Sequence, residues 1–193
     1  MPMEPAYKLL TVEEFLDTCP NDERHYQLIG GIIVAMAPPA IPHQIIAGNL
    51  TGEIYASVRA NRPNCTTRSQ AGIAPQGLLG RDHFETDITV TCEPGGYRGI
   101  AAEPLLTVEI LSPSTERDDH FVKLPQYQAI PSLREILYVE SERIAAIVYR
   151  RQADGWDAIE IDGPGARLEL LTIGLDLPLA AIYRGVPGLT AAG

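Results

Sequence analysis

The sequence has no run of about twenty strongly apolar residues, so we expect no membrane-spanning helix and no membrane partner. Its first residues, Met1 to Pro5, lack a basic region followed by an apolar segment, which predicts no secretory signal. Cys19, Cys65 and Cys92 are scattered and are never spaced as Cys-x-x-Cys. This spacing argues against a disulfide framework and a cysteine zinc site, and it favours a reducing, cytoplasmic location.

Basic residues are scarce: 15 Lys and Arg stand against 25 Asp and Glu, so the formal net charge is −10. Because affinity for a phosphate backbone comes mainly from Lys and Arg, this balance argues against a nucleic-acid partner without excluding one. A local basic strip or a bound divalent cation can offset the overall field. Five arginines near predicted element ends fit such a strip and an ordinary solvated surface equally well: Arg59, Arg62, Arg68, Arg81 and Arg98.

The hydrophobic pattern predicts helices and strands within a single domain over residues 1–193. A capping box at Thr11 and Glu14 marks the start of a short first helix, and Gly30-Gly31 marks the turn of a hairpin. The other predicted elements are a helix over 42–60, an extended segment over 65–73, strands over 84–91, 105–111 and 136–139, a helix over 118–130, a meander over 144–149, 156–161 and 168–171, and a short C-terminal helix or coil. This order predicts an α/β or α+β fold with a mixed sheet.

The segment Leu105–Pro113 has the composition of a buried strand, yet it contains one carboxylate, Glu109. A buried carboxylate costs several kcal/mol unless it is paired, so we expect a partner. Lys123, on the following helix, is a candidate for that partner. The alternative places Glu109 on an edge strand in water and pairs Lys123 with Asp119, one helical turn away.

The preceding predicted strand alternates with period two, which puts Thr86 on one face and Asp87 and Thr89 on the other. Because strands adjacent in sequence are usually adjacent in space, we expect Asp87 and Glu109 on neighbouring strands, about 5 Å apart. Both carboxylates can then share one hard divalent cation, with the backbone carbonyl of Ile110 as a further oxygen ligand.

Several segments of the chain resemble one bacterial family. They are Leu10–Leu16, Tyr26–Ile29, Pro38-Pro39 with His43-Gln44, Thr86–Ile88, Val108–Thr115, the residues Asp119, Lys123 and Tyr127, and Ile130–Val139. Together they resemble the Uma-type putative restriction endonucleases, also called domain of unknown function 820, within the PD-(D/E)XK nuclease superfamily. The similarity covers about residues 9–185, and the Glu-Ile-Leu-Ser-Pro-Ser-Thr segment followed by Asp, Lys and Tyr is its most specific part.

The resemblance implies a restriction-endonuclease-like core, in which helices flank a mixed sheet and Mg²⁺ or Mn²⁺ binds at the sheet edge. It implies a metal-dependent endonuclease that hydrolyses phosphodiester bonds of nucleic acid, with DNA as the expected substrate. A homodimer is a separate expectation, since cleavage of a duplex needs two active sites or two visits by one. Asp87 and Glu109 match the family's two acids, as catalytic residues and metal ligands together with the Ile110 carbonyl. Lys123 matches the catalytic lysine, because Leu111 occupies the position where the superfamily usually places it.

Two positions depart from the family pattern. Many relatives carry a glutamate where this chain has Gln27, and a neutral oxygen there would weaken metal binding. Pro125 lies within the helix that carries Lys123 and limits that helix unless it falls in the first turn. Tyr127 is predicted to support the site by packing or hydrogen bonding, and His43 fits either the site or the surface.

Two other functions stay open on the sequence. One is a nuclease fold whose chemistry has lapsed, acting as a binding or oligomeric module, as Gln27 and the acidic charge would favour. The other is a carboxylate acid–base enzyme acting on a small substrate, which would need neither Lys123 nor a metal.

Overall fold

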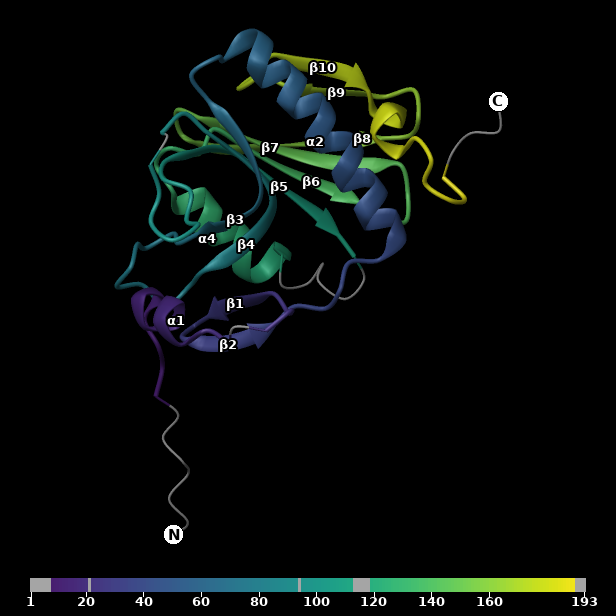
Figure 1. Cartoon of the computed structure of the whole chain (residues 1–193). Coiled ribbons are helices and arrows are strands. Elements are labelled where there is room, and N and C mark those ends of the chain that lie inside the picture. The colour runs from purple at the N-terminus through teal and green to yellow at the C-terminus, as the bar shows by residue number, and fades with distance from the viewer. Residues whose placement is uncertain (1–7, 21, 94, 113–118, 190–193) are drawn as a thin grey trace.

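A six-stranded mixed sheet forms the centre of the molecule, with strand order β3-β4-β5-β6-β7-β8 (Figure 1). The computed structural model describes residues 8–20, 22–93, 95–112 and 119–189. The strands are β3 Thr66–Ile73, β4 Phe84–Thr91, β5 Pro104–Leu111, β6 Glu135–Glu140, β7 Ala145–Gln152 and β8 Gly155–Asp162. The β5–β6 pair is parallel and the other pairs are antiparallel. The predicted α+β fold with a mixed sheet is therefore confirmed.

Helices cover both faces of this sheet (Figure 1). Helix α2 (Ile41–Asn61) lies across one face, where its buried residues pack on the apolar side chains of β4, β5 and β6. Those helix residues recur at helical spacing, as the sequence predicts: Ile46, Leu50, Ile54 and Val58. On the opposite face, Tyr127 of α4 (Leu124–Ala129) packs with Phe84 and Tyr138. Each face thus has its own apolar cluster, because side chains alternate along a strand.

The N-terminal elements form a small layer beside the sheet. Helix α1 (Val12–Thr18) starts with the predicted capping box, since Thr11 Oγ1 accepts from the Glu14 N–H and the Glu14 carboxylate accepts from the Thr11 N–H. Strands β1 (Tyr26–Ile29) and β2 (Ile32–Ala35) form the predicted hairpin. Its turn needs glycine, because Gly30 and Gly31 have φ of 56° and 84°.

The predicted meander is wrong in its third strand. Strands β7 and β8 are neighbours in the main sheet, but β9 (Arg167–Leu170) pairs with β10 (Leu175–Pro178) in a separate hairpin. The period-two pattern reports that a segment is extended but not which strand it pairs with. The chain then enters the 3₁₀ helix η2 (Leu179–Tyr183), whose buried side chains dock on the core as predicted.

The helix predicted over 118–130 is two consecutive segments. A π-helical turn, η1 (Asp119–Lys123), leads into α4, and Pro125 lies in the first turn of α4. Proline is tolerated in the first turn of an α-helix, because its fixed φ suits that position. The change of helix type therefore occurs at Lys123. Residue 118 lies outside the described part of the chain.

The sequence argued against a disulfide framework, but the structure contains a disulfide. Cys65 and Cys92 form one, while Cys19 is free. Thr66 and Thr91 are paired on the antiparallel strands β3 and β4, so the residues just outside them face each other. The cysteines therefore no longer support a reducing compartment.

Within the described ranges, none of the helices is both long enough and apolar enough to cross a membrane.

Candidate functional site

Strands β4 and β5 separate at Asp87. Going toward Asp87, their ladder ends at the pair Ile88–Val108. Beyond this pair, the backbone N–H of Ile110, two residues after Val108, donates to Asp87 Oδ2 at 2.7 Å. A side-chain carboxylate thus satisfies a strand N–H at the point where the neighbouring backbone turns away. Asp87 and Glu109 lie on neighbouring strands, as predicted.

The backbone around Asp87 is irregular on its other side as well. Gln70 lies opposite Asp87 on β3, between residues that pair with Ile88 and Thr86, and its φ is 53°. The Thr86 and Thr89 hydroxyls are 2.7 Å apart, so both side chains lie on one side of β4. The predicted strict alternation is therefore wrong across Asp87. Such irregularities re-aim side chains and recur beside functional sites.

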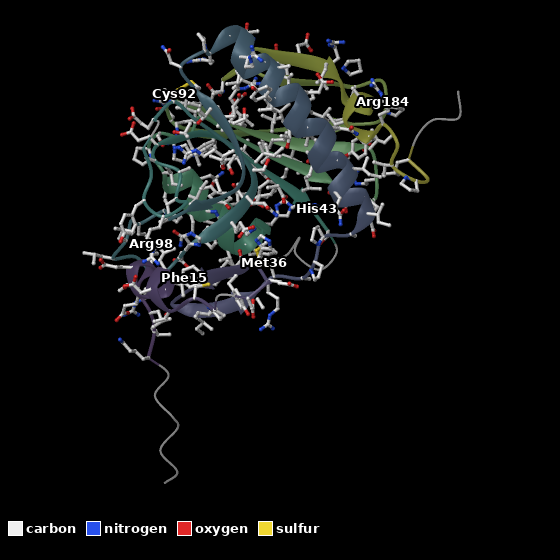
Figure 2. The ribbon with its side chains drawn as sticks, viewed as in Figure 1. Phe15, Met36, His43, Cys92, Arg98 and Arg184 are labelled. Carbon is white, nitrogen blue, oxygen red and sulfur yellow. A yellow bond between two sulfur atoms is a disulfide. The ribbon has the colours of Figure 1, made fainter. Side chains whose placement is uncertain are left out.

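His43 contacts Asp87 from the first turn of α2. Its Nε2 lies 3.1 Å from Asp87 Oδ1, and the two side chains are 17% and 20% exposed. Figure 2 shows His43 between α2 and the strands of the sheet. The sequence did not decide whether His43 belongs to the site or to the ordinary surface. The structure places it against Asp87. The signal available in the sequence was the resembling segment that contains His43.

Glu109 is buried, and two side chains contact it from the α4 side of the sheet, opposite α2. Lys123 Nζ lies 3.2 Å from Glu109 Oε1, with both side chains only 5% exposed. The Tyr127 hydroxyl donates to the same oxygen at 2.5 Å, and its ring packs edge-on against Phe84. Lys123 and Tyr127 lie one helical turn apart, which lets both reach Glu109. The predicted partner of the buried carboxylate is confirmed, and Tyr127 makes contacts of the predicted kind, while the side chain of Asp119 lies outside the described part.

The oxygen donors near the strand separation fit a hard cation by their chemistry. Among the described residues, no three His, Cys, Asp or Glu side chains lie close enough together to hold a metal ion. Asp87 is contacted from α2 and Glu109 from the α4 side of the sheet, so their sharing of one cation with the carbonyl of Ile110 stays a prediction. In an extended strand the N–H and C=O of one residue point to the same edge, so the Ile110 carbonyl faces β4 as its N–H does. Carboxylate and carbonyl oxygens suit Mg²⁺ or Mn²⁺, whereas zinc prefers nitrogen and sulfur ligands.

Gln27 is a buried polar residue of β1. It is 9% exposed, and within the described residues its Oε1 has no hydrogen-bond partner. An unsatisfied buried oxygen of this kind costs about 1–3 kcal/mol and calls for an explanation.

Three of the arginines proposed for a phosphate strip have local partners. Arg98 pairs with Asp17, and Arg68 donates to the Gly95 carbonyl. The guanidinium of Arg59 lies 5.8 Å from the centre of the Tyr55 ring. These contacts favour the ordinary-surface interpretation for these three residues.

Comparison with known proteins shows the fold and the family of the chain. The chain has a TM-score of 0.73 and 20% identity to a crystal structure titled as a putative nuclease belonging to DUF820, from Anabaena variabilis. The match covers 91% of this chain and 98% of that one, so the two share a fold. Residues 12–180 match the Uma2 family, described as "Putative restriction endonuclease", and the chain belongs to that family. It is also 29% identical over 188 residues to uncharacterized protein slr1290 of Synechocystis sp., covering 96% of each chain.

Proposed function

We propose that this protein is a metal-dependent endonuclease that hydrolyses phosphodiester bonds of DNA. The observation that carries the proposal is the buried group of Glu109, Lys123 and Tyr127, joined through Ile110 to Asp87 where β4 and β5 separate. Burial of a carboxylate and a lysine together is costly, and a catalytic role explains why the chain retains them. Membership of a family of putative restriction endonucleases supports the same reaction.

Phosphodiester hydrolysis requires an activated water, a stabilised phosphorane and a stabilised leaving oxygen. Asp87, Glu109 and the Ile110 carbonyl would hold Mg²⁺ or Mn²⁺. When bound, the cation would supply charge neutralisation and a lowered pKa of bound water. Lys123 stabilises the charge that builds on the phosphate oxygens or orients the attacking water. Tyr127 holds the Glu109 carboxylate in place by its hydrogen bond.

The metal is also the element that reconciles an acidic protein with a polyanionic substrate. The net charge of −10 repels phosphate, and a divalent cation held by Asp87 and Glu109 would offset their negative charge locally. We further propose a homodimer, because cleaving both strands of a duplex requires two active sites or two visits by one.

The second candidate is a lapsed nuclease that acts as a binding module. Two observations favour it: the absence of any three-residue metal group among the described side chains, and the neutral Gln27. In this case Lys123 would serve only as the ion-pair partner of Glu109, and His43 only as a structural contact of Asp87.

Calorimetric titration with Mn²⁺ tests the proposal when it is combined with cleavage of a labelled duplex and a labelled single strand. We expect binding that Asp87→Asn and Glu109→Gln each weaken, and cleavage that EDTA abolishes. Asp157→Asn, on the exposed outer strand β8, is the matched control and should change neither. A wild-type chain that neither binds Mn²⁺ nor cuts either substrate would leave the lapsed nuclease as the better description.

A further inference from the structure

We propose that His43 is a positioning residue, which holds the Asp87 carboxylate in its cation-binding orientation and is not itself a metal ligand. This inference rests on the proposed function. Its first observation is the 3.1 Å contact between His43 Nε2 and Asp87 Oδ1. Because a carboxylate oxygen accepts hydrogen bonds, Nε2 carries the hydrogen in this contact.

The direction in which Nε2 points favours positioning over ligation. His43 Nδ1 is buried, and within the described residues it has no hydrogen-bond partner. To bind a metal through Nε2, neutral histidine must move its proton to Nδ1. A ligating histidine almost always donates that second N–H to a carboxylate, carbonyl or water. In this structure Nε2 instead faces Asp87 Oδ1 at 3.1 Å, so the geometry favours a donor to Asp87.

His43 and Ile110 together fix the orientation of the carboxylate. Oδ2 accepts from the Ile110 N–H at 2.7 Å, and Oδ1 faces His43. One contact comes from β5 and the other from α2, so the carboxylate is clamped between the sheet and the helix. An ionised carboxylate has about four lone-pair sites, and these two contacts leave the others available for a cation. Removing His43 would free one end of the clamp.

A pair of substitutions separates the hydrogen bond from the bulk of the side chain. In His43→Gln the amide nitrogen can take the place of Nε2, whereas His43→Leu fills the space without a donor. We expect His43→Leu to weaken Mn²⁺ binding about tenfold or more, the usual effect of losing a group that orients a metal ligand. His43→Gln should stay close to the wild type in Mn²⁺ affinity.

A matched control is the histidine that contacts Glu85, which lies on β4 with Asp87. His25 Nδ1 lies 2.7 Å from Glu85 Oε1, a histidine–carboxylate pair two residues before Asp87 with His25 half-exposed. His25→Leu should therefore leave Mn²⁺ affinity unchanged. Circular dichroism and thermal unfolding of each variant establish that it is folded.

The ratio of Ni²⁺ to Mg²⁺ affinity provides a second readout that does not require cleavage. Imidazole ligands favour Ni²⁺ over Mg²⁺, so loss of a ligand would lower this ratio. For a positioning residue, His43→Gln leaves the ratio unchanged. Equal Mn²⁺ affinity of His43→Leu and the wild type, or a reduced ratio in His43→Gln, would overturn the inference. A wild-type chain that binds no Mn²⁺ would instead overturn the metal site, and this role of His43 with it.

Discussion

Glu109 is a charged residue inside an otherwise apolar strand, and its neighbours explain how the fold tolerates it. Its side chain is 5% exposed and contacts both the Lys123 ammonium and the Tyr127 hydroxyl. A buried ion pair contributes little net stability, but removing one partner leaves an uncompensated charge. We therefore expect Glu109 and Lys123 to affect both the stability of the fold and the rate of cleavage.

Lys123→Met tests both expectations. The change should lower the free energy of unfolding by about 3–5 kcal/mol, since Glu109 stays buried without its cation. It should reduce cleavage by about two to three orders of magnitude, as expected for loss of a preorganised charge, while Mn²⁺ affinity stays at least as high as in the wild type. Urea unfolding, cleavage rates and calorimetry measure the three effects.

Lys8→Met is the control, because the Lys8–Glu14 pair lies on the surface, with the Lys8 side chain 75% exposed. Such pairs contribute about 0–1 kcal/mol, so this variant should behave as wild type. Unchanged cleavage by Lys123→Met would return Lys123 to a purely structural role.

Gln27→Glu asks whether the unsatisfied amide oxygen belongs to the site. A carboxylate in place of the buried Oε1 is costly without a cation and favourable with one. We therefore expect the variant to bind Mn²⁺ more tightly and to gain more in melting temperature on Mn²⁺ addition than the wild type. Equal Mn²⁺ affinity in the two proteins would show that Gln27 lies outside the site.

At the scale of elements, α1 and β1 pack against the start of β4. This packing holds β4 just before the irregular backbone at Asp87. His83 forms an isolated bridge with Leu28, and its ring lies 5.1 Å from the Phe15 ring. Figure 2 shows Phe15 on α1, in the lower part of the molecule. Burial lowers the pKa of His83, so its imidazole stays neutral in the folded chain at a pH where the unfolded chain takes up a proton.

The lowered pKa of His83 predicts the direction in which stability changes with pH. As the pH falls below the unfolded-state pKa of about 6.5, the unfolded chain binds a proton that the folded chain does not, so stability decreases. His83→Gln removes this contribution and should flatten the dependence by up to about 1.4 kcal/mol per pH unit. Urea unfolding of both proteins from about pH 7.5 to about pH 5 measures the difference. Parallel curves would mean that His83 does not carry the effect.

At the scale of the whole molecule, the acidic charge and the proposed substrate conflict. With a net charge of −10, the free chain has no general attraction for a phosphate backbone. Recognition would then depend on the cation, which links substrate binding to the state of Asp87 and Glu109. This dependence differs from that of nucleic-acid-binding proteins with large basic surfaces.

Binding of a labelled duplex should therefore require a divalent cation. In fluorescence anisotropy at constant ionic strength, we expect weak binding in EDTA and clearly tighter binding with Ca²⁺, used as a hard cation expected to bind without supporting cleavage. Asp87→Asn should lose the Ca²⁺-dependent part. Equal affinity in EDTA and Ca²⁺ would contradict a metal-bridged complex, and sedimentation of the same samples would report whether the chain is a dimer.

The sequence by itself determined the elements whose signals are local. The capping box at Thr11, the glycine turn at Gly30-Gly31, the apolar period of α2 and the buried β5 strand all depend on residues within a few positions of one another. The single carboxylate in β5 also predicted that Glu109 would have a partner, because burying an unpaired charge is too costly.

Only the tertiary structure decided features that depend on register and on contacts between distant segments. Strand pairing brought Cys65 and Cys92 together and put β9 beside β10, and period-two patterns do not specify a pairing partner. The irregularity at Asp87 and its contact with His43 arise where β3, β4, β5 and α2 meet. No stretch of sequence carries that information, because the conformation there is set by the packing of four elements against one another.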